Sequence, residues 1–288
     1  LPGVAYWCGI ADAAWTAIGL AVGTYINWLI VSKRLRRYSV KAGNAITLPE
    51  FFSNRFHEKK KVIMTIAAIF ILIFFTVYAS SCLVTCGKLF SKLFGAPYVA
   101  MMILGAVFVL LYTVLGGFLA ESASDFMQAI VMIIALVAIV ICGTSAAGGI
   151  DVVLENAKAI PGFFEFFGIA SPTVADGVQV VEAGKPVFGE AGTYGLLTIL
   201  STTAWGLGYF GMPHIIIRFM SLRSDKDLKK SAKIGITWTV LILTFSVLAG
   251  IVGHLLLGEI ADSSTVFIQM VRKLFPFALI SGLILSAI

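Results

Sequence analysis

Residues 202–227 read TTAWGLGYFGMPHIIIRFMSLRSDKD and hold the side chains of this chain best suited to contact a small ligand. Trp205 and Tyr209 lie four residues apart, so an α-helix would place both on one face. Each offers an apolar ring with one polar tip. Pro213 continues that face and lacks the N–H that would bond the carbonyl of Tyr209. We therefore expect a pocket for a small solute with an apolar part and a few polar atoms, and a Tyr209 carbonyl open to that solute.

The same stretch is interrupted where a membrane helix would be continuous, because Gly206, Gly208 and Gly211 precede the proline. An unpaired backbone group is costly in lipid, so a broken helix persists only where it faces protein or a wet cavity. Transporters place such breaks beside their substrates and ions. Two alternatives remain open. The glycines could permit close helix packing, and the two aromatic rings could anchor the helix at the membrane interface.

The composition indicates an all-α polytopic membrane protein. Hydrophobic residues make up 59% of the 288 residues, charged residues only 12%, and the mean hydropathy is +0.98. A soluble domain carries about 25% charged residues. We find no paired carboxylates with a pocket, no nucleophile with its base and no phosphate loop, so an enzyme is not expected. The net charge of +6 is concentrated in two loops, which favours a topology signal over nucleic-acid binding.

Apolar stretches of about 20 residues are typical of spanning helices. They predict about six full spans plus partial helices at both ends of the chain. The full spans are expected at about 10–31, 62–87, 98–118, 124–146, 194–219 and 233–257, with partial helices over 1–9 and from about 265 onward. The third span is expected to end at Gly116 and Gly117. We treat residues 1–288 as a single transmembrane core.

Charge predicts the orientation of these spans. The loop 32–61 holds nine lysines and arginines, and residues 218–233 hold six more. By the positive-inside rule the loops 32–61 and 220–232 are expected to be cytoplasmic, in a multi-pass protein of the cell membrane. The loop 147–192, with six acids against two lysines, is then extracellular. The basic loops could in addition contact anionic lipid head groups.

Four polar side chains within or beside the spans need an explanation. Asp12 is a candidate for the ion path, because a carboxylate in a membrane segment is costly, although it could also reach interfacial water. Asn27 is expected to make an interhelical hydrogen bond. His214 could sense protons, but packing against neighbours is the preferred interpretation. Arg218 is expected to extend to the interface.

Three motifs resemble the sodium/solute symporter family, and within it the sodium/proline symporters. AWGLGYFGMPHIIIRFM at 204–220 is similar to the family's seventh-helix signature. ITLPEFFSNRF at 46–56 is similar to its cytoplasmic loop motif, and LYTVLGGFLAESASDFMQA at 111–129 to its fifth-to-sixth helix segment. Residues 1–28 resemble the end of the second helix and the third. The similarity covers the whole chain, and the combination of motifs is specific where no single one would be.

The resemblance implies a partial LeuT-type inverted-repeat helix bundle and a role for particular residues. Trp205, Tyr209, Pro213 and Gly208 would line the substrate site, and Tyr112 would face the same cavity. A Tyr anchored near the cytoplasmic interface is the alternative for Tyr112. Asp151 matches a family aspartate that could influence ion access or cap a helix, and the cap is preferred.

Sodium is the coupling ion that the resemblance implies. The family's sodium-bearing segments would lie outside this chain, so no metal ligands are assigned here, and the chain is expected to be a fragment of a longer protein. It is expected to be unable to transport, or to bind sodium normally, by itself.

The expected function is sodium-coupled symport of a small organic solute by alternating access, with proline as the first candidate. Met212 stands where proline symporters typically have Gln, which leaves pantothenate, a monocarboxylate or a sugar as alternatives. A symporter-like membrane sensor domain of a signalling protein is the alternative from another class. The expected partners are the solute and the lipid bilayer, with no nucleic acid. The oligomeric state stays open.

Overall fold

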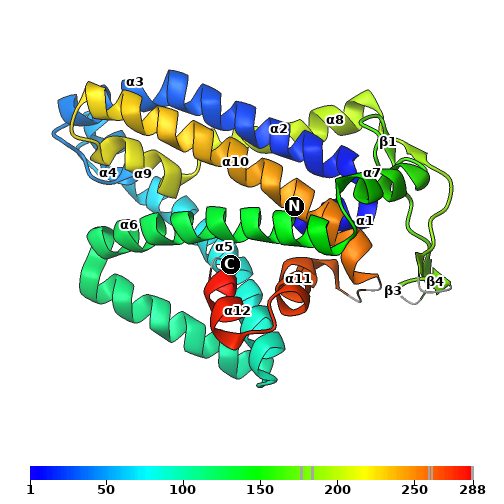
Figure 1. The fold of residues 1–288 in the computed structure, drawn as a ribbon. Helices are drawn as coiled ribbons and strands as arrows, with labels where there is room; N and C mark the ends of the chain where they lie inside the picture. The colour runs from blue at the N-terminus through cyan, green and yellow to red at the C-terminus, as the bar shows by residue number, and fades with distance from the viewer. Residues whose placement is uncertain (176–177, 183–184, 259, 261, 287–288) are drawn as a thin grey trace. The chain divides into compact units, whose positions relative to one another are not determined.

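The computed structural model describes residues 1–175, 178–182, 185–258, 260 and 262–286 (Figure 1). Helices make up most of this part of the chain. They are α1 (Pro2–Cys8), α2 (Ile10–Ile26), η1 (Asn27–Ser32), α3 (Lys33–Lys41), α4 (Leu48–Arg55), α5 (Val62–Phe94), α6 (Tyr98–Ala146), α7 (Ile150–Ala159), α8 (Leu196–Thr203), η2 (Ala204–Phe210), α9 (Pro213–Ser221), α10 (Asp225–Leu257), η3 (Ser263–Thr265), α11 (Val266–Leu274) and α12 (Ala278–Leu285).

In the described part of the segment after α7, six two-residue strands form three antiparallel pairs. They are β1 (Gly168–Ile169) with β6 (Gly192–Thr193), β2 (Val174–Ala175) with β3 (Val178–Gln179), and β4 (Val181–Glu182) with β5 (Lys185–Pro186). The expected outer loop 147–192 therefore has local structure of its own, because α7 opens it and β1 pairs with its last residues.

Among the described residues, four helices are long and apolar enough to cross a membrane. They are Ile10–Lys41, Val62–Phe94, Tyr98–Ala146 and Lys226–Leu257, and a shorter apolar helix covers Leu196–Phe210. The broad expectation of a polytopic helical membrane protein agrees with these lengths.

Two expected spans form one continuous run in α6. Gly117 interrupts it with φ 56° and ψ −152°, a conformation that only glycine adopts readily. The interruption falls where the sequence predicted that the third span would end.

The segment 32–61 was expected to be a loop, and this expectation is wrong. The first long helix continues through the π-helical turn η1 and α3 as far as Lys41. A second short helix, α4, follows, and the Thr47 side chain caps it by accepting a hydrogen bond from the Glu50 N–H at 3.3 Å. The basic residues that signal orientation are therefore carried largely on helices. Charge patterning predicts the side of the membrane but not the backbone conformation.

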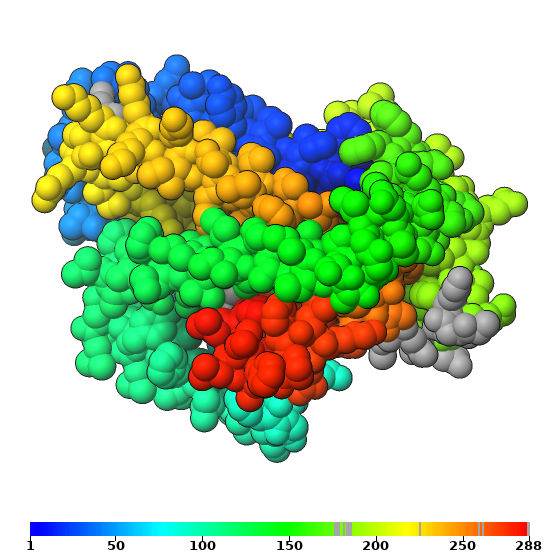
Figure 2. Space-filling view, in the orientation of Figure 1, coloured from blue at the N-terminus to red at the C-terminus, as the bar shows by residue number. Residues whose placement is uncertain are grey.

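The chain divides into two compact units. Unit 1 contains Leu1–Thr24, Phe126–Gly208 and Ile234–Ile288, and unit 2 contains Tyr25–Asp125 and Tyr209–Lys233. In unit 1, Ala11, Tyr194 and Ile199 form a buried cluster. The side chains of α11 and α12, also in unit 1, form one continuous surface in Figure 2. In unit 2, buried residues of α4 (Leu48 and Phe51) and α9 (Ile216 and Met220) pack together with Ala45, which precedes α4.

Glycines bring the backbones of α2 and of the α8–η2 segment into contact within unit 1. A Cβ atom added at Gly19 would meet the backbone of Thr203, and one added at Gly23 would meet the backbone of Gly206. A Cβ added at Gly206 would in turn meet the backbone of Gly19. Small residues four apart are a typical means of close packing between membrane helices. Gly206 therefore serves packing, whereas a Cβ at Gly208 has no neighbouring atom within 4 Å.

This contact predicts different outcomes for two glycines of the same short helix. Gly206→Ala should destabilise the protein by about 1–3 kcal/mol, because its methyl group overpacks a backbone-to-backbone contact. Gly208→Ala should leave stability nearly unchanged. Thermal unfolding in detergent measures both. Equal melting temperatures for the two variants would contradict the packing role of Gly206.

Candidate functional site

The helix that carries the aromatic residues is broken, as the sequence predicted. α8 changes into the 3₁₀-helix η2 at Ala204, and η2 ends at Phe210. Met212 is extended, with φ −72° and ψ 112°, and α9 begins at Pro213. Proline suits the first helical position, because the N–H that it lacks would have no helical partner there. The carbonyl of Met212 then accepts the N–H groups of Ile215 and Ile216, both at 3.1 Å.

The carbonyl of Tyr209 was expected to be open to a ligand, and the structure corrects this. The side-chain Nδ2 of Asn27 donates a hydrogen bond to the Tyr209 oxygen at 2.8 Å, within unit 2. Asn27 is the first residue of η1 and is only 1% exposed. The expected interhelical hydrogen bond of Asn27 is therefore confirmed, and its acceptor is the carbonyl for which Pro213 offers no N–H donor.

The two aromatic rings do not share one face as an α-helix would require. In a 3₁₀-helix, residues three apart are aligned, so residues four apart are turned by about 120°. Trp205 therefore aligns with Gly208, and its side chain is 70% exposed, whereas Tyr209 is half-buried. The expectation of a single Trp205–Tyr209 face failed because it assumed a helix with 3.6 residues per turn.

The candidate substrate residues are distributed over both units. Trp205 and Gly208 belong to unit 1, and Tyr209, Pro213 and Tyr112 belong to unit 2. Tyr112 is half-buried on α6, and its ring packs edge-on against Phe108 with 6.0 Å between the ring centroids. Within unit 2, Tyr209 and Pro213 flank the break directly. All five assignments to the substrate site stay predictions.

His214 is packed between aromatic rings, as preferred from the sequence. Its ring stacks on Tyr78 with centroids 5.7 Å apart and meets Phe75 edge-on at 5.6 Å. Its Nδ1 is buried without a hydrogen-bond partner among the described residues. These contacts attach the first turn of α9 to α5 within unit 2.

Arg218 does not simply extend to the membrane interface. Its guanidinium donates to the Asp125 carboxylate on α6, also within unit 2. The two side chains are 48% and 39% exposed, so water screens the ion pair and its net contribution to stability is small. No local sequence pattern indicates this pairing, because 93 residues separate the partners.

Asp12 is held by a hydroxyl network within unit 1. The Tyr194 hydroxyl donates to Asp12 Oδ1 at 2.6 Å and shares a second hydrogen bond of 2.8 Å with Thr202 Oγ1. Tyr194 is only 3% exposed. This network provides a structural reason for a carboxylate at that position.

Asp151 is the second residue of α7 and is exposed. Its negative charge there interacts favourably with the helix dipole. This placement is compatible with the preferred helix-terminal role and does not test a role in ion access.

Two features of this region escaped the sequence reasoning. The Gly19 and Gly23 pair on α2 carries the four-residue spacing of close helix packing, and that spacing was a usable signal. The hydrogen bond from Asn27 to Tyr209 joins residues 182 positions apart, so only the folded chain could identify the acceptor. Among the described residues, no group of three or more His, Cys, Asp or Glu side chains could hold a metal ion.

The model of the Sodium:solute symporter family matches residues 1–288. The chain belongs to this family. It is 39% identical over 292 residues to the sodium/proline symporter 2 of Staphylococcus saprophyticus. The matched region covers all of this chain and 52% of that protein. It is 37% identical to the osmoregulated proline transporter OpuE and 39% identical to the high-affinity proline transporter PutP, both of Bacillus subtilis.

The chain spans about half the length of these curated relatives: 52% of the S. saprophyticus protein, 54% of OpuE and 56% of PutP. The break at Gly211 and Met212 therefore lies in a symporter-family chain. What the whole protein transports is a separate question.

The Asp12 network predicts unequal effects of two conservative changes. Tyr194→Phe should destabilise the protein by about 1–3 kcal/mol, because the half-buried carboxylate of Asp12 loses its hydroxyl donor. Asp12→Asn should cost less, since an amide oxygen still accepts from Tyr194. A double-mutant cycle on unfolding in detergent should give a coupling of at least about 0.5 kcal/mol.

Tyr25→Phe is the matched control, because Tyr25 is 52% exposed. Additive effects of the two substitutions would contradict the network. A changed sodium dependence of transport in Asp12→Asn, with unchanged stability, would instead place Asp12 in the ion path.

Proposed function

We propose that the protein containing this chain is a sodium-coupled symporter of a small organic solute, with proline as the first candidate. The observation that carries the proposal is the break between η2 and α9, at Gly211 and Met212, in a chain of the symporter family. Broken helices of transporters meet substrate and ions near the middle of the membrane. The relatives named above are described as proline symporters or transporters, which supports proline.

The architecture that we propose is a partial LeuT-type bundle with residues 1–288 as one transmembrane core. The kink at Gly117 allows α6 to form two membrane spans. A broken span would consist of α8, η2 and α9. The segments 32–61 and 220–232 would face the cytoplasm and 147–192 the outside, since basic residues concentrate on the first two.

In this proposal Tyr209 and Pro213 contact the solute at the break. Trp205, Gly208 and Tyr112 complete the apolar part of the site. Rings with one polar tip suit a solute such as proline, whose ring is apolar and whose amine and carboxylate are polar. Asp12 and Asp151 remain candidates for the ion path, and the residues that ligate sodium lie outside the assigned set.

The mechanism is alternating access. Sodium and solute bind together in the outward-open state and favour closure of the outer gate, and the broken helices then move to open the inner side. Sodium can drive this cycle only if its affinity differs between the two states. No covalent bond changes, so the site needs binding and positioning groups and no catalytic residue.

Met212 favours a second candidate within the same class. The family resemblance places Gln at this position in proline symporters, and a thioether cannot replace the hydrogen bonds of an amide. Another solute, such as pantothenate, a monocarboxylate or a sugar, is therefore kept as the alternative to proline. A sensor domain is the remaining alternative.

Uptake of labelled proline into liposomes that hold the full-length protein tests the proposal. We expect uptake that requires an inward sodium gradient, and a reduction of about tenfold or more in Trp205→Ala, because a large contact area of the solute is lost. Trp205→Phe should retain most of the activity. Trp15→Phe is the matched control, because its indole donates to the Phe166 carbonyl outside the proposed site.

Each outcome of this experiment has a distinct meaning. Uptake without sodium dependence would contradict the coupling. Sodium-dependent uptake that Trp205→Ala leaves unchanged would remove Trp205 from the site. Absence of proline uptake that Met212→Gln restores would assign the natural solute to another chemical class. Absence of uptake for every solute tested would favour the sensor alternative.

A further inference from the structure

We propose that Asn27 is a positioning residue of the solute site. Its side-chain amide fixes the Tyr209 carbonyl, and with it the geometry of the helix break. This inference rests on the proposed function, in which Tyr209 contacts the solute. It assigns a role to a residue on η1, which does not belong to the broken helix.

The backbone at the break needs a donor from elsewhere. In a continuous helix the N–H of residue 213 would bond the Tyr209 carbonyl, but proline has none. Asn27 Nδ2 supplies the donor at 2.8 Å. In a membrane, water cannot readily replace it. The carbonyl and the ring of Tyr209 belong to one residue, so restraining the carbonyl restrains the ring that would face the solute.

The side-chain oxygen of Asn27 indicates that this position requires the N–H donor of the amide. Asn27 Oδ1 is buried and has no hydrogen-bond partner among the described residues. A buried acceptor without a partner is destabilising, and an apolar side chain of the same size would avoid that cost. The asparagine is therefore explained by its N–H groups rather than by its volume. The Tyr209 oxygen only accepts, so the nitrogen of the amide must be the atom that faces it.

Neighbouring contacts hold Asn27 in place against the broken helix. The next residue, Trp28, packs on Phe219 of α9 with ring centroids 4.5 Å apart, and Phe219 is only 1% exposed. Asn27 thus contacts the end of η2, and Trp28 contacts α9 on the other side of the break. Asn27 also opens a π-helical turn, and such turns occur frequently at functional sites.

Two substitutions in the full-length protein test this role. Asn27→Leu keeps the branched shape of the side chain but removes the donor, and should raise the KM for proline about tenfold or more at every pH, with a smaller change in kcat. Asn27→Asp should show a similarly raised KM for proline near pH 8, because a carboxylate can accept hydrogen bonds but cannot donate one. It should recover towards wild type near pH 5, where a buried and therefore protonated carboxyl can donate to the carbonyl.

Asn54 provides a matched control in the same unit. Its Nδ2 also donates to a backbone carbonyl, that of Ala42, at 2.8 Å, but at a site far along the chain from the break. Asn54→Leu and Asn54→Asp should leave the proline KM unchanged and show no recovery at low pH. A wild-type KM in Asn27→Leu, or a pH response of Asn27→Asp equal to that of Asn54→Asp, would overturn the inference.

A second readout is independent of the solute. Hydrogen–deuterium exchange in Asn27→Leu should speed up about tenfold in peptides that cover residues 204–214, with α5 peptides unchanged. Unchanged exchange at 204–214 would overturn the positioning role. If the wild type takes up no proline, the proposed substrate fails while this exchange experiment still decides the role of Asn27. If Asn27→Leu does not fold, Asn27→Asp compared near pH 8 and pH 5 carries the test.

A different observation carries a second inference. A hollow of about 670 Å³ in unit 2 joins α3 to the segment between α9 and α10, and the described residues that line it include five cationic side chains. In Figure 2 the blue atoms of α3 and the yellow atoms of this segment lie side by side. The lining residues are Arg34, Arg36, Arg37, Tyr38, Val40, Lys41, Arg223 and Ser224.

We infer that this hollow binds the phosphate of an anionic phospholipid head group. α3 continues the spanning helix Ile10–Lys41 without interruption, so its basic residues follow directly from the membrane. Arginine forms paired hydrogen bonds to phosphate, and the lining residues include the arginines Arg34, Arg36 and Arg223. Val40 and Tyr38 are 49% and 43% exposed and offer apolar surface for the glycerol end of a lipid.

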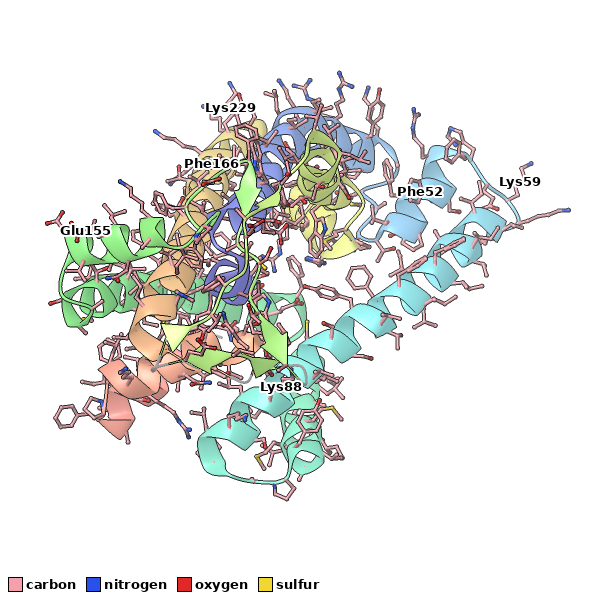
Figure 3. All side chains as sticks on the ribbon, turned by 90° about the vertical axis from the view of Figure 1, so that its right-hand side faces the viewer. Phe52, Lys59, Lys88, Glu155, Phe166 and Lys229 are labelled. Carbon is pink, nitrogen blue, oxygen red and sulfur yellow. The ribbon has the colours of Figure 1, made fainter. Side chains whose placement is uncertain are left out.

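Binding to vesicles of phosphatidylglycerol and of phosphatidylcholine tests this inference. Arg34→Gln with Arg223→Gln should weaken binding of labelled phosphatidylglycerol by the full-length protein about tenfold, and should leave phosphatidylcholine unaffected. Lys59→Gln with Lys60→Gln removes the same charge outside the hollow. Lys59 points away from the helices at the start of α5 (Figure 3), so this control should change binding little.

The outcomes separate the sources of phosphate. An equal loss of phosphatidylglycerol binding in both double variants would show that general surface charge accounts for the binding, and would overturn the inference. Competition by inorganic phosphate as strong as by the lipid would also overturn it, because the hollow would then bind a soluble anion. A loss confined to the arginine variant, with weak competition by phosphate, supports the lipid site.

Discussion

The central constraint on this structure is that lipid offers no hydrogen-bond partner to a backbone carbonyl. A proline in the middle of an apolar helix removes one donor, and the carbonyl of Tyr209 is the group affected. The chain meets this need with Asn27, which is buried and donates to that carbonyl. The break can therefore exist as a defined structure, with 3₁₀ geometry before it and a new helix that starts at Pro213 after it.

The surroundings of the break are fixed by contacts of two kinds. Before the break, within unit 1, glycines of α2 allow that helix to approach the backbone of α8 and η2. After the break, within unit 2, aromatic rings hold α9: His214 stacks on Tyr78, and Phe219 packs on Trp28. Within each unit the elements beside the break are therefore supported by packing.

Part of this could be predicted from the sequence. The length of the apolar stretches predicted a helical membrane protein. Gly117 predicted the interruption of α6, and the segment from Gly211 to Pro213 predicted the broken helix. These two predictions succeeded because glycine and proline act through local backbone geometry. The expected loop at 32–61 was wrong, since charge indicates sidedness and not conformation. The shared face of Trp205 and Tyr209 was wrong because the turn there is 3₁₀. The partners of Tyr209, Arg218 and Asp12 are distant in the chain, so no local pattern could have identified them.

The central claim is that the interruption between Phe210 and Pro213 is a solute site. A cryo-electron microscopy map of the full-length protein with sodium and proline tests it most directly. The account predicts an interrupted helix over residues 204–221, with ligand density in contact with Tyr209 and Pro213. A continuous α-helix through these residues, or ligand density elsewhere, would contradict it.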